Sequence, residues 1–416
     1  MKLAYGHQEL NLELPAGVPS KLLGPAPVQT LIEPENALLK ALRNPIASPP
    51  LQELVQAGES ICLLVNDSTR VARSEFFLPF LVNELKEAGI KKEDIFIVFT
   101  NGTHRPLDKK EMESLVGHDV AKNTAMFNHD SKDENELVYL GETSFKTPVY
   151  VNKKVYSADR RILTGSVVHH FFAGFGGGRK ALMPGVAGFE TIRKNHSLLL
   201  EDGAESGKLE GNPVHEDLLE AASMVGCDFL LNTVLNEKKQ ILGIFAGDMI
   251  KAHLKACELV QKANGVELDR LADVVIASCG GYPKDINVYQ AHKTLDNCTR
   301  AMKPGGKMVL LAECTEGIGS AAYEEWATRY RTVEEVEAAL RSNFMLGGHK
   351  AYTVAKLLQQ GDVYLVSALQ PETAKMLGFI PAQSLQDAVR EIYRDNQGQF
   401  TYIIPQGSIT FPLISD

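Results

Sequence analysis

The sequence predicts an α/β protein made of two α/β domains with largely parallel sheets. In residues 51–100, and again from residue 273, apolar strand-like runs alternate with amphipathic helical runs. This alternation is typical of parallel strands joined by helical crossovers. A chain of 416 residues is also too long for one ordinary hydrophobic core. We therefore expect two domains, each with its own sheet.

The domain boundary is predicted where the composition changes, at residues 265–271, after a helical run at residues 249–264. Residues 1–266 are assigned to the first domain and residues 267–416 to the second. Residues 1–50 predict a peripheral strand followed by a proline-rich connector. The last residues of the chain are expected to be able to pack back on the first domain.

The composition argues against several classes of protein. A formal charge of −9 disfavours general binding to nucleic acid or to an anionic membrane, because both need clustered Lys and Arg. The N-terminus lacks the apolar segment of a secretory signal, and no stretch approaches the ~18 apolar residues of a membrane span. The six cysteines form no C-x-x-C pair, which indicates free thiols. We expect a reduced, cytoplasmic protein.

Reactive side chains follow three consecutive predicted strands of the first domain. Ligands of open parallel sheets bind at the carboxyl ends of the strands, so these side chains are expected to converge on one edge. The three groups are Asp67 and Arg70 after the strand at 61–65, His104 after the strand at 95–99, and His169 and His170 after the run at 161–164.

A glycine-rich loop follows the paired histidines, in the run GSVVHHFFAGFGGGRK that ends at Lys180. Unpaired N–H groups in such a loop favour an anion such as a phosphate. The loop is not a Walker loop, because Ala181 follows Lys180, and it is not a dinucleotide fingerprint, because Arg179 replaces the third glycine. The sequence therefore predicts a ligand cradle of another kind. Its four glycines are Gly174, Gly176, Gly177 and Gly178.

A helix is predicted from about Gly188, with Phe189, Ile192, His196 and Leu199 on one face. His196 then points inward. Buried histidines are usually structural, so a hydrogen-bonded core histidine is the alternative to a ligand. Its position after the glycine loop favours a functional role.

A helix of the second domain carries Tyr289, Gln290 and Lys293 at spacings of three and four residues. These spacings place the three side chains on one helical face. A solvated polar stripe is the alternative interpretation, because exposed Lys and Gln are common.

Taken together, these side chains are suited to acid/base catalysis on a small anionic substrate. Two histidines on different strand ends can flank one ligand, and Arg70 can hold a carboxylate through two parallel hydrogen bonds. This allows isomerisation, hydration or redox chemistry at a carbon next to a carboxylate, and the residues alone do not choose among them. The histidine spacing fits no zinc motif, so a metal would need ligands beyond the side chains.

Five motifs emerge from the strand ends, the loop and the helices. They are Asp67-x-x-Arg70, Gly102-Thr103-His104-Arg105-Pro106, the run from His170 to Lys180, Asn195-His196, and Tyr282-Pro283-Lys284-Asp285-Ile286-Asn287-x-Tyr289-Gln290-x-x-Lys293. Together they resemble the nickel-dependent lactate racemase family. The resemblance extends from about residue 5 to near the C-terminus, and every position of the family's site that can be placed is matched.

The resemblance implies a nickel-pincer nucleotide, that is, a Ni-bound pyridinium-3-thioamide-5-thiocarboxylic acid mononucleotide. In the family a lysine holds this cofactor covalently through a thioamide, and the matching residue is Lys180. The matching metal ligand is His196, and nickel accepts such sulfur, carbon and imidazole ligands in a square-planar arrangement. The family's loop commonly has a hydroxyl residue where Gly176 stands, so a phosphate or cofactor contact is either missing here or replaced by backbone. Further cofactor contacts are implied for Asp67, Gly176, Gly177, Gly178 and Tyr289.

The implied activity is racemisation or epimerisation of a 2-hydroxy acid, with the active site in the cleft between the two domains. His104 and His170 match two alternating general acid/base residues, one on each side of the substrate, while the C2 hydride moves reversibly to the cofactor. A positioned acid/base contributes only ~10²–10⁴-fold, too little for this C–H bond without an electron sink. Arg70, Gln290 and Lys293 are implied to bind the substrate.

The implied partners are a small 2-hydroxy-acid substrate and the enzymes that synthesise and load the cofactor. Because the family extends from lactate to larger 2-hydroxy acids and sugar acids, the substrate's side chain stays open, as does the oligomeric state. Two alternatives remain. One is an oxidoreductase or isomerase that uses an exchangeable nucleotide cofactor, and the other is a non-catalytic metallocofactor carrier whose polar groups are structural.

Overall fold

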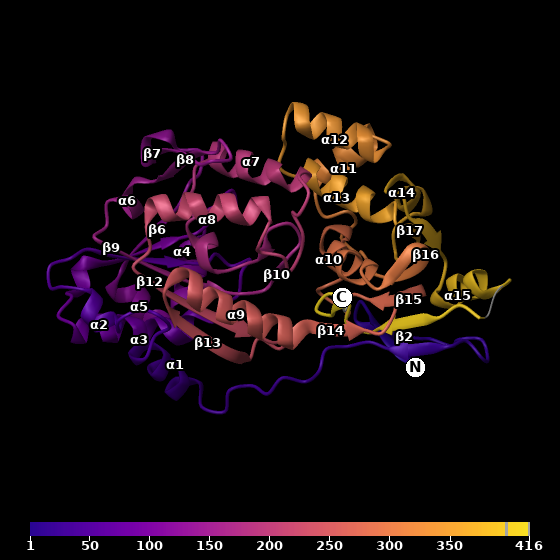
Figure 1. The fold of residues 1–416 in the computed structure, drawn as a ribbon, viewed down its shortest axis with the longest axis horizontal. Coiled ribbons are helices and arrows are strands. Elements are labelled where there is room, and N and C mark those ends of the chain that lie inside the picture. Colours follow the sequence, from indigo (N-terminus) through magenta and orange to yellow (C-terminus); the bar gives the residue numbers. More distant parts are fainter. Residues whose placement is uncertain (396–397, 415–416) are drawn as a thin grey trace. The chain divides into compact units, whose positions relative to one another are not determined.

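The computed structural model describes residues 1–395 and 398–414 and confirms the predicted α/β class (Figure 1). The chain forms two compact units, each with a mainly parallel six-stranded sheet. The first unit comprises residues 28–262, and the second comprises residues 1–27 together with residues 263–416.

The sheet of the first unit has the strand order β13-β12-β9-β4-β5-β6. Strand β13 runs antiparallel to β12, and the other neighbouring pairs are parallel. Every residue of β4, ICLLV, is buried, as expected for a strand of a parallel sheet that is covered on both faces. The strands are β4 (Ile61–Val65), β5 (Ile95–Phe99), β6 (Ala125–Asn128), β9 (Arg160–Ser166), β12 (Phe229–Leu235) and β13 (Ile241–Gly247).

Helices and two small hairpins complete the first unit. Leu63 and Val65 of β4 share a hydrophobic core with Phe77 and Leu81 of α3. The helices are α1 (Pro34–Arg43), α2 (Leu51–Leu54), α3 (Ser74–Glu87), α4 (Lys109–Val116), α5 (His118–Asn123), α6 (Lys153–Tyr156), α7 (Phe189–Ser197), α8 (Pro213–Val225) and α9 (Met249–Asn264), which leads into the second unit. The hairpins pair β7 (Leu137–Glu142) with β8 (Pro148–Asn152), and β10 (His169–His170) with β11 (Gly174–Phe175).

Strand order decides where the site forms. Strand β4 lies between β9 and β5 and is parallel to both, so the carboxyl ends of these three strands are adjacent. The residues that follow these three strands include the reactive side chains that the sequence predicts there. The expected convergence on one edge is therefore present.

The second unit has an all-parallel sheet of order β18-β17-β16-β15-β19-β3. Its strands are β15 (Ala272–Ser278), β16 (Met302–Leu311), β17 (Gly361–Val366), β18 (Ile380–Ala382), β19 (Thr401–Ile404) and β3 (Ser20–Leu22). Two smaller pairs are β1 (Lys2–Tyr5) with β2 (Gln8–Asn11), and β14 (Gly265–Leu268) with β20 (Phe411–Ile414). Its helices are α10 (Val288–Thr299), α11 (Ala321–Arg329), α12 (Val333–Ser342), α13 (Gly348–Leu358), α14 (Pro371–Met376) and α15 (Leu385–Tyr393).

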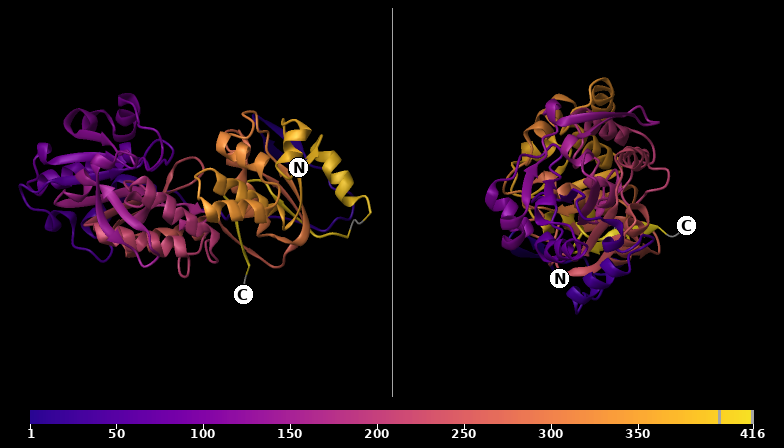
Figure 2. Two further views of the ribbon diagram at one scale, coloured as in Figure 1. Left: turned by 90° about the horizontal axis from the view of Figure 1, so that it is seen from above. Right: turned by 90° about the vertical axis from the view of Figure 1, so that its left-hand side faces the viewer.

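The ends of the chain correct the predicted domain assignment. Residues 1–27 belong to the second unit, because β3 extends its sheet beside β19; Figures 1 and 2 show these indigo strands among orange and yellow elements. The predicted first domain, residues 1–266, therefore loses its first 27 residues. Residues 411–414 pair with β14 within the second unit. Residues 396–397 and 415–416 of the predicted second domain lie outside the described residues.

The helix predicted from about Gly188 is shorter than predicted. Helix α7 ends at Ser197, and Leu198–Leu200 then form a 3₁₀ turn that contains Leu199. The buried residues of α7 are Thr191, Ile192 and Asn195, while His196 is half-buried. The buried face of α7 therefore includes Asn195, whereas the sequence predicts its neighbour His196 on that face.

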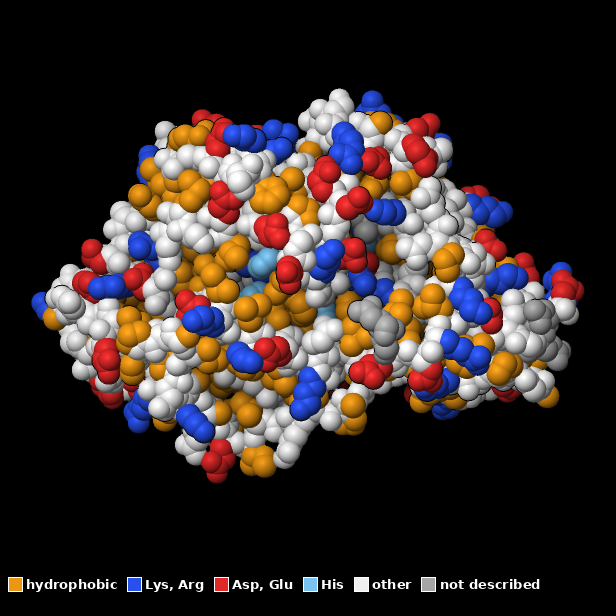
Figure 3. All heavy atoms as spheres, in the orientation of Figure 1, with side chains coloured by type: hydrophobic (Ala, Val, Ile, Leu, Met, Phe, Trp, Pro, Cys, Tyr) orange, Lys and Arg blue, Asp and Glu red, His pale blue; other side chains and the backbone are white. Residues whose placement is uncertain are grey.

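The surface and the cysteines show no unusual feature. All six cysteines are free thiols, as predicted, and five of them are buried. In the described part of the chain, no helix has both the length and the apolar character needed to cross a bilayer. On the face drawn in Figure 3, basic and acidic side chains are interspersed.

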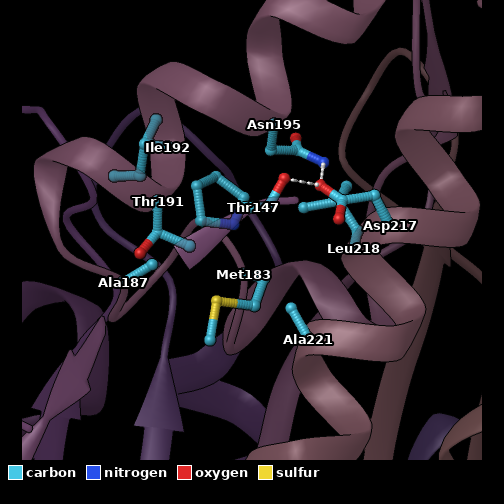
Figure 4. Close-up of a pocket in the computed structure, with 10 residues that line it drawn as sticks. Thr147, Met183, Ala187, Thr191, Ile192, Asn195, Asp217, Leu218 and Ala221 are labelled. Carbon is cyan, nitrogen blue, oxygen red and sulfur yellow. Dashed lines mark hydrogen bonds between the residues drawn. The ribbon is translucent and has the colours of Figure 1, made fainter. Parts of the chain in front are cut away.

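A buried carboxylate ties α7 and α8 to the β7–β8 hairpin (Figure 4). Asp217 of α8 is fully buried and accepts hydrogen bonds from Thr143 Oγ1 (2.5 Å), Thr147 Oγ1 (2.9 Å) and Asn195 Nδ2 (2.8 Å). A cavity of about 10 Å³ lies beside this network, too small for a substrate. Since Asn195 precedes His196, the network positions the end of α7 that carries this histidine.

Replacing Asp217 with alanine is expected to lower the free energy of unfolding by about 3 kcal/mol or more, because three buried donors lose their acceptor. Urea denaturation followed by circular dichroism measures the change. The matched control is Glu220→Ala on the same helix, whose bonds to Ser144 are exposed and whose loss should cost less than about 1 kcal/mol. Equal losses in the two variants would contradict the assignment.

Candidate active site

The ends of β4 and β5 carry a hydrogen-bonded pair. His104 Nδ1 donates to Asp67 Oδ2 at 2.5 Å, while Thr69 binds Asp67 Oδ1 through its backbone N–H (3.1 Å) and its hydroxyl (2.7 Å). Asp67 is 3% exposed, whereas the His104 side chain is 45% exposed. The sequence predicts Asp67 as a cofactor-binding residue, but both of its oxygens are used within the protein. Its direct partner is His104.

The charge of Asp67 determines that His104 Nδ1 is the donor in their hydrogen bond. Burial raises the pKa of Asp67, but hydrogen bonds from His104 and Thr69 and the charges of His104 and Arg70 bring it below its ordinary value. An ionised carboxylate can only accept, so the shared proton belongs to His104 Nδ1. In the neutral ring this leaves a lone pair on Nε2. Nε2 is therefore the basic atom of His104.

The loop that carries His104 contacts the segment that follows Lys180. Gly102 N–H donates to Gly185 O at 2.9 Å. Both positions require glycine: Gly102 has a φ of +55°, and a Cβ on Gly185 would lie 2.2 Å from Ala181 O. The two loops that carry His104 and Lys180 are therefore held together by backbone contact.

His170 and Lys180 form a second pair. His170 Nδ1 accepts the Ala173 N–H at 3.3 Å, and His170 Nε2 lies 3.2 Å from Lys180 Nζ. A neutral ring that accepts at Nδ1 carries its proton on Nε2. The Nε2–H therefore donates to Lys180 Nζ, and an amine that accepts a hydrogen bond is uncharged. The geometry describes a neutral histidine beside a neutral lysine.

The surroundings of His170 and Lys180 also favour the neutral form of both side chains. Burial, followed by the charges of Arg179 and Arg70, lowers the pKa of Lys180 well below its ordinary value. Burial, followed by the charge of Lys180, lowers the pKa of His170 well below its ordinary value. Desolvation disfavours the charged form of both groups. The two lowered pKa values therefore agree with the neutral histidine and neutral lysine that the hydrogen bonds indicate.

Arg179 is a buried cation beneath the loop. It is 1% exposed, and its guanidinium donates to Phe175 O (2.9 Å) and Ala173 O (2.8 Å). Burial lowers the pKa of Arg179 to about 10, so it stays charged at neutral pH. Within the described residues, no carboxylate forms an ion pair with it. Arg179 thus braces the loop and adds positive potential next to Lys180.

The glycines of the loop serve mainly its own packing. Gly176 N–H donates to Val168 O, and Gly178 N–H donates to Asn232 Oδ1 at 2.8 Å. A Cβ on Gly177 would lie 2.7 Å from Val167 Cγ2, and one on Gly178 would lie 2.7 Å from His253 Cγ. The sequence predicts unpaired N–H groups that face an anion, and for Gly176 and Gly178 this is wrong.

The two adjacent histidines have different surroundings. His169 Nε2 lies 3.1 Å from Gln261 Oε1, and its ring contacts Phe175. His170 is the one beside Lys180. The ring of Phe172 lies under Lys180 Nζ, at 5.7 Å, and meets the His196 ring edge-on at 5.1 Å. Lys180 and His196, sixteen positions apart, therefore contact the same aromatic side chain.

The predicted residues of the second unit lie on α10. Asn287 caps this helix by accepting Gln290 N–H at 3.0 Å. Lys293 Nζ donates to Gln290 Oε1 at 2.9 Å, so these side chains share one face, as predicted. Tyr289 lies on the same turn, and its ring contacts Lys350 of α13 at 4.8 Å.

Comparison with known proteins identifies two family domains along the chain. Residues 5–207 match the model of the lactate racemase N-terminal domain, and residues 268–410 match that of the lactate racemase C-terminal domain. The chain belongs to the lactate racemase family. This places it among the racemases, a class of isomerases, and confirms the family resemblance of its motifs.

Two curated members of the lactate racemase family are similar over most of their length. The lactate racemase of Thermoanaerobacterium thermosaccharolyticum is 31% identical over 98% of this chain and 97% of its own. That of Lactiplantibacillus plantarum is 33% identical over 88% of each. The structure of the T. thermosaccharolyticum apoprotein matches with a TM-score of 0.89, at 30% identity, over 100% of this chain and 99% of the other. A Thermotoga maritima protein, at 20% identity and a TM-score of 0.64 over 88% of this chain and 96% of the other, shares the fold.

Three residues that shape this lactate racemase family site were missed at the sequence level. Thr69 fixes Asp67, Arg179 braces the loop, and His253 of α9 binds Gly176 O at 2.8 Å. Arg179 had a visible signal, since it stands where a dinucleotide loop has glycine. His253 gave no such signal in the sequence, because it lies 73 positions after Lys180.

Buried neutral histidines are expected to make the protein sensitive to acid. Burial lowers the pKa of His215 and His253 to about 3, and it also lowers that of His129. Below the ordinary value of 6.5 the unfolded chain binds these protons and the folded chain does not. Each such histidine therefore removes up to about 1.4 kcal/mol of stability per pH unit as the pH falls below that value.

Urea denaturation of the cofactor-free chain between pH 7 and pH 5.5, where most carboxylates stay ionised, tests this expectation. In His253→Asn the slope should decrease by about 1 kcal/mol per pH unit. The control is His118→Asn, an exposed histidine whose pKa is raised by Glu113, which should leave the slope nearly unchanged. A wild-type stability that does not depend on pH in this range would contradict the neutral assignments.

Proposed function

We propose that this chain is a racemase or epimerase of lactate or a related 2-hydroxy acid, with a nickel-pincer nucleotide attached to Lys180 and His196 as the protein ligand of the nickel. The observation that supports it is the different hydrogen bonding of two imidazoles. His104 offers a lone pair at Nε2, held by Asp67, while His170 offers a proton at Nε2. A racemase needs one base and one acid that can exchange roles.

The residues around Lys180 fit such a cofactor. A neutral amine can be acylated, whereas an ammonium cannot. The buried charge of Arg179 and the nearby charge of Arg70 favour an anionic group at this site. Phe172 contacts both Lys180 and His196. A cofactor ring attached to Lys180 and the metal ligand His196 would therefore both lie next to this aromatic side chain. When bound, the cofactor would supply a reversible acceptor for the C2 hydride.

The chain's own groups then move the proton. His104 Nε2 accepts the hydroxyl proton of one enantiomer, and His170 Nε2 serves the other. In the cofactor-free chain the His170 proton is bound by the Lys180 amine. Acylation removes that lone pair, because an amide-type nitrogen is a poor acceptor. Attachment of the cofactor thus frees His170 for the substrate.

Charged and polar side chains would bind the substrate's carboxylate. Arg70 is exposed, and among the residues that the structure describes its guanidinium makes only long hydrogen bonds of 3.3 Å within its own loop, so it can turn toward a ligand. Gln290 and Lys293 already share a hydrogen bond on α10. Loading by cofactor-synthesis enzymes and a cytoplasmic location belong to the same proposal.

The test is chiral analysis of a panel of 2-hydroxy acids. Protein produced with nickel and the cofactor-synthesis enzymes should convert each pure enantiomer of at least one acid into a mixture of both, and protein produced without these enzymes should not. Substrate deuterated at C2 should keep its deuterium, because a hydride that returns does not exchange with water.

Loss of the deuterium to solvent would contradict hydride return. Activity restored to dialysed protein by free nicotinamide nucleotide would favour the oxidoreductase alternative. Formation of racemic product with unexchanged deuterium would exclude a cofactor carrier without catalysis.

A further inference from the structure

A fourth strand of the first sheet also ends in a histidine. Strand β6 is parallel to β5, so its carboxyl end lies beside the strand end that carries His104. His129 directly follows β6 and is 2% exposed. Because a buried polar side chain needs hydrogen-bond partners, the partners of His129 indicate what it does.

Both ring nitrogens of His129 bind protein groups. Nε2 lies 2.9 Å from Ala187 O and must donate, because a carbonyl oxygen only accepts. Nδ1 lies 3.3 Å from Asn152 Nδ2. Asn152 Oδ1 already accepts the N–H groups of Lys154 and Val155, so the Asn152 amide N–H donates to Nδ1. The ring is therefore neutral, and burial lowers the pKa of His129, in agreement with these bonds.

The backbone of His129 holds the loop that carries His104. Its N–H donates to Asn101 Oδ1 at 3.2 Å, and Asn101 Nδ2 donates to Arg105 O at 3.2 Å. The His104 N–H donates to Asn101 O at 2.8 Å. Asn101 is 1% exposed. Its buried amide thus closes the loop around His104, and His129 orients that amide.

The ring of His129 holds the segment that leads from the glycine-rich loop into α7. The acceptor of its Nε2–H, Ala187, is fully buried in this segment. Two residues earlier, Gly185 O accepts the N–H of Gly102, from the loop of His104. The segment is therefore bound at Gly185 by the His104 loop and at Ala187 by His129, which is itself bound to the same loop.

We propose that His129 is a positioning residue of the racemase site, which fixes the loop of His104 against the segment that joins Lys180 to His196. The proposal rests on the proposed function for the roles of the three residues that it positions. A misplacement of about 1 Å can slow an enzyme about a hundredfold, even when the altered residue lies away from the chemistry. Two bonds of His129 resist such a shift, one from its ring and one from its backbone.

Substitution separates these two bonds, because it changes the ring and keeps the backbone N–H. His129→Leu removes both ring bonds, and His129→Gln can place an amide N–H near the position of Nε2. Arg161→Met is the matched control. Arg161 also joins backbone segments, by donating to Ala158 O (2.6 Å) and Gly226 O (3.2 Å), but it lies at the start of β9, the end of the strand away from the site. Should His129→Leu fail to fold by circular dichroism, His129→Asn, whose side chain is too short to reach Ala187 O, replaces it.

Amide hydrogen exchange of the cofactor-free chain, followed by mass spectrometry, is measured first. Residues 101–105 and 185–189 should exchange about tenfold faster in His129→Leu than in the wild type, because both segments lose a buried tie. His129→Gln should exchange more slowly than His129→Leu in both segments. Arg161→Met should leave both segments unchanged.

Protein produced with nickel and the cofactor-synthesis enzymes is then assayed. In His129→Leu, kcat should fall about tenfold to a hundredfold, whereas KM and bound nickel stay near the wild-type values, because the substrate-binding side chains and the attachment point are retained. His129→Gln should recover most of kcat. Added to His104→Ala, His129→Leu should slow racemisation little further, because its effect passes through His104.

The proposal is overturned if exchange in the two segments is unchanged in His129→Leu, if nickel is lost in proportion to activity, or if Arg161→Met slows racemisation as much. Losses that add fully to that of His104→Ala, or no recovery in His129→Gln, would also overturn it. Since the exchange measurement needs no cofactor, it stands even if the loaded chain racemises no acid. A failed racemase assay would therefore count against the proposed function alone.

Discussion

Lys180→Arg is expected to abolish racemisation, with a loss of about 10³-fold or more, and to eliminate the cofactor adduct from the intact mass. Arginine stays protonated at any usable pH and cannot be acylated. It also cannot accept the proton that His170 Nε2 now donates to the lysine amine. The variant should therefore lose the attachment point and the neutral partner of His170 together.

The matched control is Lys255→Arg, an exposed residue of α9 paired with Glu258. It should load and turn over like the wild type. A second measurement needs no cofactor: at pH 7 an amine-directed reagent should modify Lys180 before Lys255, because only the neutral amine reacts and the pKa of Lys180 is lowered. An adduct that persists in Lys180→Arg would place the attachment elsewhere.

The sequence was sufficient for the sheet and for the strand ends that carry the reactive side chains, because both depend on local patterns. The apolar runs of β4 and β5 are buried on both faces, and a parallel sheet brings their exits together. The assignment of residues 1–27 to the second unit was not predictable from such local patterns. Strand β3 is exposed along its whole length and joins β19 through backbone hydrogen bonds, which leave little trace in the side-chain pattern.

Within the site, the residue types were predictable but several of their partners were not. The sequence did not show which side chain Asp67 contacts, and the structure shows its hydrogen bond to His104. The glycines of the loop suggested a phosphate cradle, yet Gly177 and Gly178 make room for Val167, Asn232 and His253. Close backbone approach to a ligand and close approach to the protein itself have the same sequence signature.

His104→Ala is expected to slow racemisation by about 10²–10⁴-fold, the contribution of one positioned acid/base, while the bound nickel stays near the wild-type amount. His104 is hydrogen-bonded to Asp67, whereas Lys180 and His196 meet at Phe172, so its loss should not disturb cofactor attachment. Chiral rate measurements and metal analysis on the same sample separate the two effects. Loss of nickel in this variant would instead place His104 at the metal.

Asp67→Asn should reproduce most of this loss without removing the imidazole. An asparagine amide can donate to Nδ1, which moves the ring proton to Nε2 and removes the lone pair that accepts the substrate's proton. Since both changes act on one atom, the double variant should be little slower than His104→Ala alone. Fully additive losses would mean that Asp67 contributes through a separate route, such as the cofactor contact that the family resemblance implied.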